Sequence, residues 1–315
     1  MKIVITGGAG FIGSHITDRM QAEGHELLVV DDLSSGFREN IPASVPLVED
    51  SFASDNALQQ ISVFQPDVVI HAAAQISVRK SMEDPAFDAE VNVKSILKML
   101  NVLQSQQSIR PHLVFISTGG AMYGDTDQVP TAESAPILPE SLYGLHKRFG
   151  ELYFDFYYRV SGLPYTVLRL GNVYGPRQNP HGEAGVVAIF SEKLLRGEPC
   201  TIFGDGLQTR DFVYVGDVVE AVALTTAAAA SGNAKIGTYN VGTGEEVTVK
   251  HLFELMKETA GSSSELVFAP GRPGEQKRSA IDASAIASAI NWNPRESLPS
   301  GIKLTIEWFG ERGKN

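Results

Sequence analysis

The sequence predicts an α/β protein, in which a doubly wound parallel sheet is followed by a smaller C-terminal α/β domain. Three observations predict this fold. Short β-branched runs alternate with helical patterns, a glycine-rich turn joins the first strand to the first helix, and 43% of the 315 residues are hydrophobic. Strands that alternate with helices form a parallel sheet whose crossover helices cover both faces.

The expected elements follow one another closely. Short apolar or β-branched runs ended by turn signals predict strands at 2–6, 25–32, 46–50, 66–74, 112–118 and 164–175, the last with its exit loop. Apolar residues at helical spacing predict helices at 14–24, 57–65, 86–105 and 143–160. One more strand and helix are expected over 211–230, rejoining the first domain. The expected domains are 1–168 and 169–315.

Composition excludes several classes of function. The net charge of −11 argues against a nucleic-acid partner, because a phosphate backbone requires a basic footprint. Cys200 is the only cysteine, so we expect no disulfide and no metal site built on cysteines. No run approaches the roughly 18 apolar residues of a membrane span. The chain starts on a strand pattern without a basic leader, so we expect a cytoplasmic protein that binds no membrane.

A glycine-rich turn, "TGGAGFIGS" (6–14), predicts a dinucleotide site. Gly7, Gly10 and Gly13 are spaced by three, and Gly8, Gly10 and Gly13 form G-x-G-x-x-G. In a Rossmann-type sheet these glycines allow a tight turn, close approach to a pyrophosphate and close helix packing. The free N–H groups of the following helix face the phosphates. The alternative is a tight turn without a ligand.

Other positions refine the cofactor. Asp31 follows the second strand, 18 residues after Gly13, where an acid holds the ribose 2′-OH and repels a 2′-phosphate. This position favours NAD over NADP. Asp50 ends the third strand, where it would accept from the adenine amino group unless it belongs to a surface turn. The small residues of "HAAAQISV" (71–78) would let that loop lie close to the cofactor, although a simple strand exit is the alternative.

Tyr143 and Lys147 are the candidate catalytic pair. They are four residues apart, so they lie one above the other on a helix face. A nearby ammonium lowers the pKa of a phenol, and a positive nicotinamide ring would act in the same direction. We therefore expect Tyr143 to serve as a general base near neutral pH. An exposed helix pair is the alternative, but this helix follows the strand that ends in "STGGAMYG" (117–124).

These motifs together resemble a known family. "GGAGFIG", "DDLSSG", "HAAAQISV", "STGGAMYG", "YGLHK", "LRLGNVYGPRQ", "GDGLQTRDFVYVGD", "YNVG" and "RPGE" occur in this order over nearly the whole chain. The chain resembles the extended short-chain dehydrogenases/reductases that act on nucleotide sugars, and most of all the UDP-glucose (UDP-galactose) 4-epimerases.

The resemblance implies a catalytic triad of Ser/Thr, Tyr143 and Lys147. The family's usual hydroxyl position falls on Gly119 instead of Thr118. In one interpretation Thr118 supplies the hydroxyl and Gly119 leaves room for it or for the sugar; in the other, Tyr143 acts without a relay. We favour Thr118. Ser117, one residue earlier, should point to the opposite side of the strand.

The same stretch argues against related chemistry. Family members that eliminate water carry an Asp-Glu pair just after the Thr, and the UDP-glucuronate decarboxylases carry a Glu there. This chain has Gly119, Gly120 and Ala121 at these positions, so it lacks a carboxylate to protonate a leaving hydroxyl.

The resemblance also implies two sets of binding residues. NAD is expected to contact Gly7, Gly10, Phe11, Ile12, Gly13, Asp31, Asp32, Ser35, Gly36, Asp50, Ser51, Ala72, Ala73, Ala74, Gln75, Asn92, Tyr143 and Lys147. A UDP-sugar is expected to contact Ser77, Thr118, Gly119, Gly120, Tyr143, Asn172, Val187, Thr201, Phe203, Arg210, Arg272, Glu275 and Ser279.

Several of these residues have implied roles. Arg210 and Arg272 would clamp the diphosphate, because a planar guanidinium meets two phosphate oxygens at once. Asn172 would also contact the diphosphate, and Glu275 would hold the ribose. Phe203 would lie beside the uracil, although core packing is an equal alternative. Asn92 would lie near the sugar unless it is a buried structural residue.

The sequence therefore predicts NAD-dependent C4 epimerisation of UDP-glucose and UDP-galactose through a 4-keto sugar. Ser279 is small and would leave space for an N-acetyl group, unless it is a solvated loop residue. The alternatives are a nucleotide-4-ketosugar reductase, an epimerase of another sugar nucleotide and a non-catalytic NAD-sensing protein. The family pairs the helices at 86–105 and 143–160 into a four-helix dimer contact, so a homodimer is favoured, although packing on the chain's own sheet would use the same residues.

Overall fold

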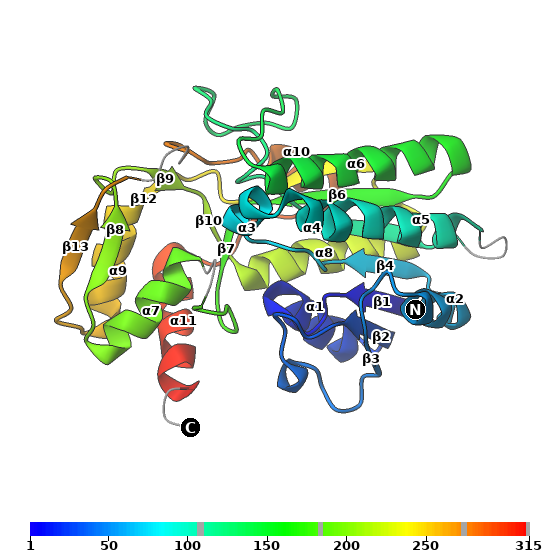
Figure 1. Ribbon diagram of the computed structural model, residues 1–315, viewed down its shortest axis with the longest axis horizontal. Helices are drawn as coiled ribbons and strands as arrows, with labels where there is room; N and C mark the ends of the chain where they lie inside the picture. The colour runs from blue at the N-terminus through cyan, green and yellow to red at the C-terminus, as the bar shows by residue number, and fades with distance from the viewer. Residues whose placement is uncertain (106–109, 182–184, 272–275, 313–315) are drawn as a thin grey trace.

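Seven parallel strands form the main sheet of the protein (Figure 1). They are β1 (Lys2–Thr6), β2 (Glu26–Asp31), β3 (Leu47–Glu49), β4 (Val68–His71), β5 (His112–Thr118), β6 (Tyr165–Leu170) and β11 (Gly237–Val241). Their order is β11-β6-β5-β4-β1-β2-β3. The computed structural model describes residues 1–105, 110–181, 185–271 and 276–312. The chain reverses its direction of travel across the sheet between β1 and β4, where such folds bind their ligands.

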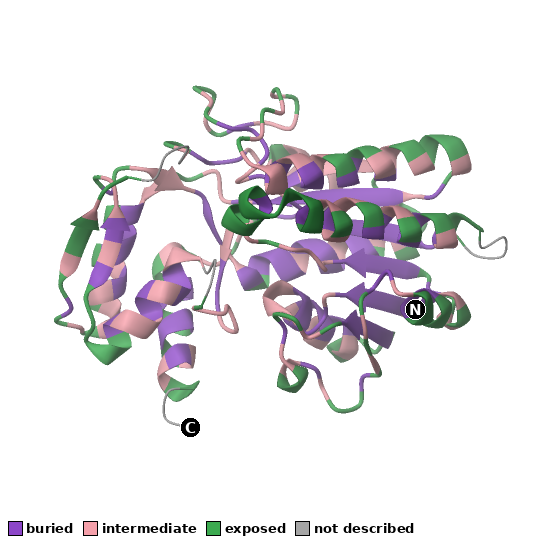
Figure 2. Cartoon of the chain, in the orientation of Figure 1, coloured by how far each residue is buried: buried purple, intermediate pink, exposed green. Residues whose placement is uncertain are grey.

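Helices cover both faces of this sheet. One face carries α1 (Phe11–Ala22), α8 (Val215–Ala230) and α10 (Ser284–Ile290), and the other α2 (Asp55–Phe64), α5 (Ser95–Ser105) and α6 (Leu142–Ser161). Ile3 and Ile5 pack into the first layer and Val4 into the second, because side chains alternate along a strand. The strands are accordingly buried along most of their length (Figure 2).

A smaller lobe lies beside the carboxyl ends of the strands (Figure 1). Its helices are α7 (Val186–Arg196), α9 (Val249–Ala260) and α11 (Leu298–Arg312), and they enclose a core that includes Phe190, Leu252 and Ile302. Three two-stranded sheets accompany them: β7 (Asn172–Tyr174) with β10 (Phe212–Tyr214), β8 (Cys200–Phe203) with β13 (Leu266–Ala269), and β9 (Thr209–Arg210) with β12 (Val247–Thr248).

The doubly wound parallel fold is confirmed, with several differences of detail. The helix expected over 86–105 is divided into α4 (Pro85–Ala89), a π-helical turn η2 (Glu90–Lys94) and α5. The Ser95 amide donates to the Glu90 carbonyl five residues back, and the Ser95 hydroxyl donates to the same oxygen at 2.8 Å, which stabilises the wider turn. Short helical segments η1 (Arg38–Asn40) and α3 (Val78–Glu83) were not expected.

The strand expected over 164–175 ends at Leu170. The Gly171 amide donates to Val241 of β11, whereas the next amide, that of Asn172, donates to the Asp211 carbonyl at 2.7 Å. The chain therefore leaves the main sheet and starts β7. A Cβ at Gly171 would lie 2.9 Å from the Asp211 carbonyl oxygen, so this crossing requires glycine.

The segment 211–241 returns to the first lobe. Helix α8 packs its Val218 and Val222 into the same layer as Ile16 of α1, and β11 pairs in parallel with β6. The expected boundary places β11 in the second domain, and the sequence pattern did not predict this strand. We propose a division in which α8 and β11 belong to the cofactor lobe.

Candidate active site

A cavity of about 780 Å³ opens at the carboxyl ends of the strands. The first lobe contributes Phe11, Ile12, Ala72, Ala74, Ile116, Ser117, Thr118, Tyr143 and Lys147 to its lining. The second lobe contributes Asn172, Gln178, Val187, Thr201, Phe203 and Arg210. The cavity thus brings the expected cofactor turn, catalytic pair and substrate residues to one place.

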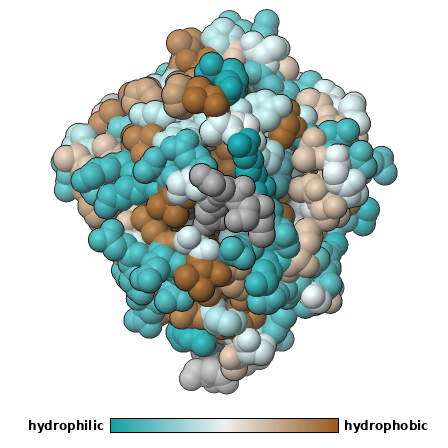
Figure 3. All heavy atoms as spheres, turned by 90° about the vertical axis from the view of Figure 1, so that its right-hand side faces the viewer, coloured by the Kyte–Doolittle hydropathy of each residue, from teal (hydrophilic) through white to brown (hydrophobic). Residues whose placement is uncertain are grey.

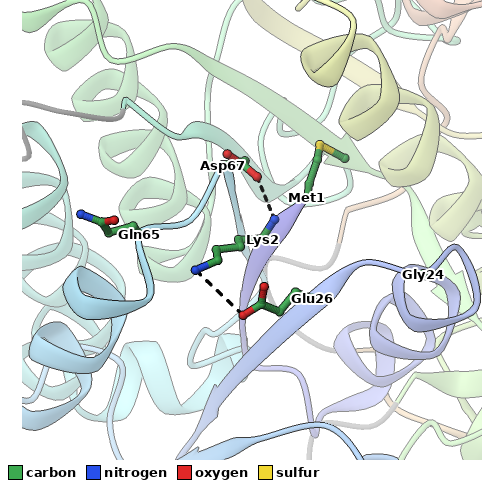
Figure 4. Close-up of a pocket in the computed structure, with 6 residues that line it drawn as sticks. All are labelled: Met1, Lys2, Gly24, Glu26, Gln65 and Asp67. Atoms are coloured by element: carbon green, nitrogen blue, oxygen red, sulfur yellow. Dashed lines mark hydrogen bonds and ion pairs between the residues drawn. The ribbon is translucent and has the colours of Figure 1, made fainter.

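A second hollow lies at the opposite ends of the strands, beside the amino ends of β1 and β2. Figure 4 shows its lining residues, Met1, Lys2, Gly24, Glu26, Gln65 and Asp67. The Lys2 amide donates to Asp67 at 2.8 Å and the Lys2 ammonium lies 4.0 Å from Glu26. This end of the molecule presents mainly hydrophilic residues with scattered apolar ones (Figure 3). Parallel sheets bind ligands at their carboxyl ends, so we assign the chemistry to the larger cavity.

Lys147 is buried beneath the end of β5. Helix α6 begins after Ser141, whose hydroxyl accepts from the Gly144 amide at 3.1 Å and caps the helix. One turn later, Lys147 Nζ donates to the Ile116 carbonyl at 2.7 Å and lies 4.6 Å from the centre of the Phe115 ring. Burial lowers the pKa of Lys147 to about 8, although the charges of Glu151 and Asp88 oppose this shift. The ammonium is therefore the main form at neutral pH.

The expected lowering of the Tyr143 pKa is wrong for the protein without cofactor. Burial raises the pKa of the phenol, and the negative charge of Asp88 raises it further. The Lys147 ammonium is directed to the Ile116 carbonyl, where it cannot outweigh the loss of water around the phenolate. Tyr143 thus holds its proton at neutral pH in this structure.

Thr118 and Ser117 lie at the end of β5 with different partners. The Ser117 hydroxyl points into the sheet layer and donates to Glu151 at 2.7 Å. The Thr118 hydroxyl accepts from the Ala121 amide at 3.2 Å, and the residue is half-buried in the cavity wall. Thr118 can still donate its proton to a ligand, whereas the Ser117 hydroxyl already donates its proton to Glu151.

Gly119 is tightly packed against a distant segment. A Cβ at Gly119 would lie 2.8 Å from Ile281 Cδ1 and 3.3 Å from the Leu170 carbonyl oxygen. A side chain at this position would therefore crowd Ile281, and the expected role of Gly119 beside Thr118 or the sugar stays a prediction. A Cβ at Gly120 would lie 3.4 Å from Asn172 Oδ1, so Gly120 is the glycine that leaves space beside a cavity residue.

The glycine-rich turn fits NAD. A Cβ at Gly13 would lie 2.0 Å from the Gly7 carbonyl oxygen, and one at Gly7 would lie 2.6 Å from the Ala73 amide nitrogen. A Cβ at Gly10 would meet only the Gly7 carbonyl oxygen, at 3.4 Å, so its other side is open to a ligand. No side chain caps α1, whose first residues Phe11 and Ile12 line the cavity. Backbone amides and an open glycine are what a pyrophosphate requires.

The acids at the ends of β2 and β3 hold loops together. Asp31 is buried, and its two oxygens accept from the amides of Ala9 at 2.8 Å and Leu33 at 2.9 Å. Burial raises the pKa of Asp31, and these hydrogen bonds oppose the shift. The carboxylate also accepts from the Gly10 amide, and with about four lone-pair sites it can still accept from a ribose hydroxyl. Asp50 accepts from the Ser51 amide at 2.8 Å at the exposed edge beyond β3.

The remaining expected residues of this loop differ in exposure. Asp32 and Ser35 are exposed, and the Asp32 carboxylate accepts from the Ser34 amide at 2.9 Å. Gly36 packs on the glycine-rich turn, because a Cβ there would lie 2.7 Å from the carbonyl carbon of Ala9.

The loop after β4 is tied down by Asn92. The Asn92 amide group accepts from the Gln75 amide nitrogen at 3.1 Å and donates to the Gln75 carbonyl at 2.8 Å. Asn92 is buried and does not line the cavity in the described part of the chain, so it acts here through the loop that carries Ala72, Ala73 and Ala74. The Ser77 hydroxyl caps α3 by accepting from Lys80, while its neighbours Ile76 and Val78 line the cavity.

The substrate end of the cavity carries polar groups that a ligand could satisfy. Asn172 Oδ1 is buried and accepts no hydrogen bond from the described residues. Arg210 donates to the backbone carbonyls of Thr209 at 2.7 Å and Gln276 at 2.9 Å, which orients its guanidinium at the cavity wall. Val187, Thr201 and Phe203 also line the wall.

Two expected substrate residues are not described, and a third does not line the cavity. Arg272 and Glu275 lie outside the described residues. Ser279 is only 5% exposed, so the alternative of a solvated loop residue is wrong. It does not itself line the cavity, but it belongs to the same segment as Gln276, which Arg210 contacts.

The sequence interpretation missed some cavity residues. Gln178 lines the cavity, and its Oε1 is buried without a partner among the described residues. It stands in the "YGPRQ" motif, whose glycine and proline mark a loop at a strand end, so the motif could have indicated it. The apolar lining residues Val186, Ile189, Phe212 and Val249 carry no comparable signal.

Known proteins resemble this chain over its whole length. The model of the NAD dependent epimerase/dehydratase family matches residues 3–242. The UDP-glucose 4-epimerase of Mycolicibacterium smegmatis is 39% identical over 319 residues, covering 100% of both chains. The UDP-glucose 4-epimerase of Thermotoga maritima, solved with UDP-glucose, is 43% identical with a TM-score of 0.93 and 99% coverage of each chain. The UDP-N-acetylglucosamine 4-epimerase of Methanobrevibacter ruminantium, solved with UDP-N-acetylmuramic acid, is 32% identical with a TM-score of 0.91, covering 99% of this chain and 98% of that one.

Proposed function

The chain belongs to the NAD-dependent epimerase/dehydratase family, and we propose that it interconverts UDP-glucose and UDP-galactose by inverting C4 of the hexose through a 4-keto sugar. One observation carries this proposal. Thr118, Tyr143 and Lys147 line the same cavity as the glycine-rich turn. The three residues directly after Thr118 carry no carboxylate. The relatives solved with UDP-sugars support the substrate class.

Each of the three side chains has a separate role in removing the proton from the sugar hydroxyl. Tyr143 takes the O4 proton, and Thr118 holds O4 in line with the phenol. Lys147 remains charged below its pKa of about 8 and stabilises the phenolate that Tyr143 must form. When bound, NAD supplies the reversible acceptor for the C4 hydride, and its positive ring favours the phenolate. Asp31 and the amides around Gly10 would hold the cofactor.

The second lobe holds the nucleotide. Arg210 and Asn172 contact the diphosphate, and Phe203 lies against the uracil. The hexose must present both faces of C4, so we infer that few groups hold it. The apolar stretch from Val186 to Phe190 in the cavity wall supports a loosely held sugar, because it offers little hydrogen bonding.

A second substrate pair is proposed on the size of Ser279. A small side chain at this position leaves space for the N-acetyl group of UDP-N-acetylglucosamine. The similarity to the UDP-N-acetylglucosamine 4-epimerase of Methanobrevibacter ruminantium supports this extension.

One incubation separates the proposed function from its alternatives. Purified protein is mixed with UDP-galactose without added NADPH, and the nucleotide sugars are resolved by chromatography. UDP-glucose is the expected product. Turnover that needs NADPH would indicate a 4-ketosugar reductase, and binding of NAD without any turnover would indicate a sensor.

A homodimer in the cytoplasm completes the proposal. Helix α6 exposes Phe149, Leu152, Phe156 and Val160 along one face, at 37%, 43%, 48% and 66% exposure. Such an apolar stripe favours a contact between two copies. No helix of the described residues is long and apolar enough to cross a membrane. Size-exclusion chromatography with light scattering tests the dimer, and Phe156→Glu should shift the protein to monomers.

A further inference from the structure

Asp88 is a buried carboxylate that joins three elements beside the cavity. The residue is 0% exposed. Its Oδ1 accepts from Gln75 Nε2 at 2.6 Å, in the loop after β4, and from Asn92 Nδ2 at 3.1 Å, in the π-helical turn. Its Oδ2 accepts from Nδ1 of His146 in α6. A buried charge is retained only where hydrogen bonds compensate the loss of water, and Asp88 has three.

His146 connects this carboxylate to the catalytic helix turn. It lies between Tyr143 and Lys147 in the chain and is itself buried. An ionised carboxylate only accepts hydrogen bonds, so Nδ1 of His146 must carry the proton that it shares with Asp88. The Tyr143 amide donates to the Ser81 hydroxyl at 3.0 Å, which fixes the same turn from α3.

We propose that Asp88 and His146 are positioning residues: their hydrogen bond fixes the first turn of α6, and with it Tyr143, against the loop 72–77 that borders the cofactor side of the cavity. The proposal rests on the epimerase activity proposed above. It adds two residues to that mechanism that touch neither the cofactor nor the sugar, since neither lines the cavity.

The charge of Asp88 gives the pair a measurable signature. Burial raises the pKa of Tyr143, and the Asp88 carboxylate raises it further. The other charged groups on the elements packed around α6 are less able to act on this phenol. Arg79, Lys80, Glu83, Glu90, Lys94 and Lys98 are exposed to water on α3 to α5. Arg169 is paired with Glu151, and His112 lies at the opposite end of β5. Among the described residues of α6, Lys147 is the only cation that lines the cavity together with Tyr143.

Asp88→Asn tests the charge while keeping the shape. We expect kcat to fall by about tenfold, because a small misplacement of a catalytic group is costly, with KM for UDP-galactose nearly unchanged. Removing the negative charge should move the acid limb of the kcat profile to lower pH. Ultraviolet difference titration, with Tyr143→Phe as the blank, should show the phenol of the Asp88→Asn protein ionising at lower pH than in the wild type. If the acid limb and the phenol ionisation of the Asp88→Asn protein occur at the same pH as in the wild type, the proposal is overturned.

His146 variants keep the inference testable if Asp88→Asn does not fold. The amide of His146→Asn can replace Nδ1 as a donor to Asp88, so kcat should stay within about threefold of wild type. His146→Leu cannot donate and should lose about tenfold in kcat. Equal activity of the two variants would overturn the positioning role.

Glu90→Gln is the matched control, because Glu90 is an exposed acid two residues from Asp88, paired with Lys94 at 2.8 Å. It should leave kcat and the pH profile unchanged. If neither the wild type nor Glu90→Gln is active, the proposed function is refuted. If the wild type is active and His146→Leu is fully active as well, only this inference is refuted.

Discussion

Lys147 Nζ donates a hydrogen bond to the carbonyl oxygen of Ile116 at 2.7 Å. This contact ties the helix that carries Tyr143 to the strand that ends at Thr118, so the hydroxyl, the phenol and the ammonium form one rigid unit. It also gives the buried ammonium a polar partner, while the charges of Glu151 and Asp88 favour its protonated form at neutral pH.

Tyr143→Phe removes the proposed general base. The phenol hydroxyl is lost while the ring remains, so we expect normal NAD content and a fall in kcat of at least about a hundredfold. Steady-state rates with UDP-galactose and chromatography of the released cofactor measure both quantities. Turnover near that of wild type would remove Tyr143 from the mechanism.

Thr118→Ala tests the shifted hydroxyl. We expect a substantial loss of kcat in Thr118→Ala and retention of much activity in Thr118→Ser, because only the latter keeps a donor at the cavity wall. Full activity of Thr118→Ala would show that Tyr143 acts without a relay.

Gly119→Ser should not rescue Thr118→Ala. The added side chain would meet Ile281 and not the cavity, so the substitution should lower the melting temperature instead. Recovery of turnover in the double variant would contradict the direction that we assign to this position.

Loss of the Lys147 proton should limit the rate in alkaline solution. Since burial lowers the pKa of Lys147 to about 8, kcat should fall as pH rises through this value and the phenolate loses its neighbouring charge. Lys147→Arg keeps its charge at all these pH values, so whatever activity it retains should lack this basic limb. The same limb in both proteins would assign the titration to another group.

Ser279→Tyr tests the substrate range. A large aromatic side chain should fill the space of the N-acetyl group, at a cost of roughly 1–3 kcal/mol or more for that substrate, and spare UDP-glucose. The ratio of kcat/KM for UDP-N-acetylglucosamine and UDP-glucose should therefore fall in Ser279→Tyr and stay near the wild-type value in Ser279→Ala. Because Ser279 is buried, melting temperatures must accompany the rates. An unchanged ratio in a folded Ser279→Tyr protein would refute the gate.

Acid should destabilise the fold through two buried histidines. Burial lowers the pKa of His112 to about 4 and that of His71 to about 3, whereas an unfolded histidine titrates at 6.5. The unfolded state therefore binds more protons between these values, so stability is lost as pH falls below about 6.5, by up to about 1.4 kcal/mol per pH unit for each histidine.

His112→Gln should weaken this acid loss. Its amide can replace the Nε2 donor to Thr166 at 2.9 Å without taking up a proton. Denaturant titrations between pH 7.5 and 4.5 should give a shallower slope of unfolding free energy for this variant than for wild type. His181→Gln, at an exposed side chain, is the control and should keep the wild-type slope. Parallel slopes for all three proteins would refute this source of acid lability.

Local pattern predicted what depends on neighbouring residues in the chain. The alternation of strands and helices, the glycine-rich turn and the four-residue spacing of Tyr143 and Lys147 all led to correct elements. Packing between distant segments was not predictable in this way. The lack of space for a side chain at Gly119 depends on Ile281, and β11 is a short strand recognised only by its pairing with β6. The contact of Asp88 with Gln75 and His146 likewise requires the folded arrangement of three elements.

The pKa of Tyr143 shows the same limit in energetic terms. Spacing on a helix predicts the neighbour, but the ionisation of a phenol depends on how much water and which charges surround it. Burial and Asp88 both raise the pKa of this phenol, and neither effect can be read from a four-residue interval.

Isotope transfer at C4 tests the central claim most directly. Purified protein is incubated with UDP-galactose that carries deuterium at C4 of the hexose, without added NADH or NADPH, and the product is examined by NMR spectroscopy. The account predicts UDP-glucose that retains the deuterium at C4. Loss of the label to water, or absence of UDP-glucose until a reduced cofactor is added, would contradict it.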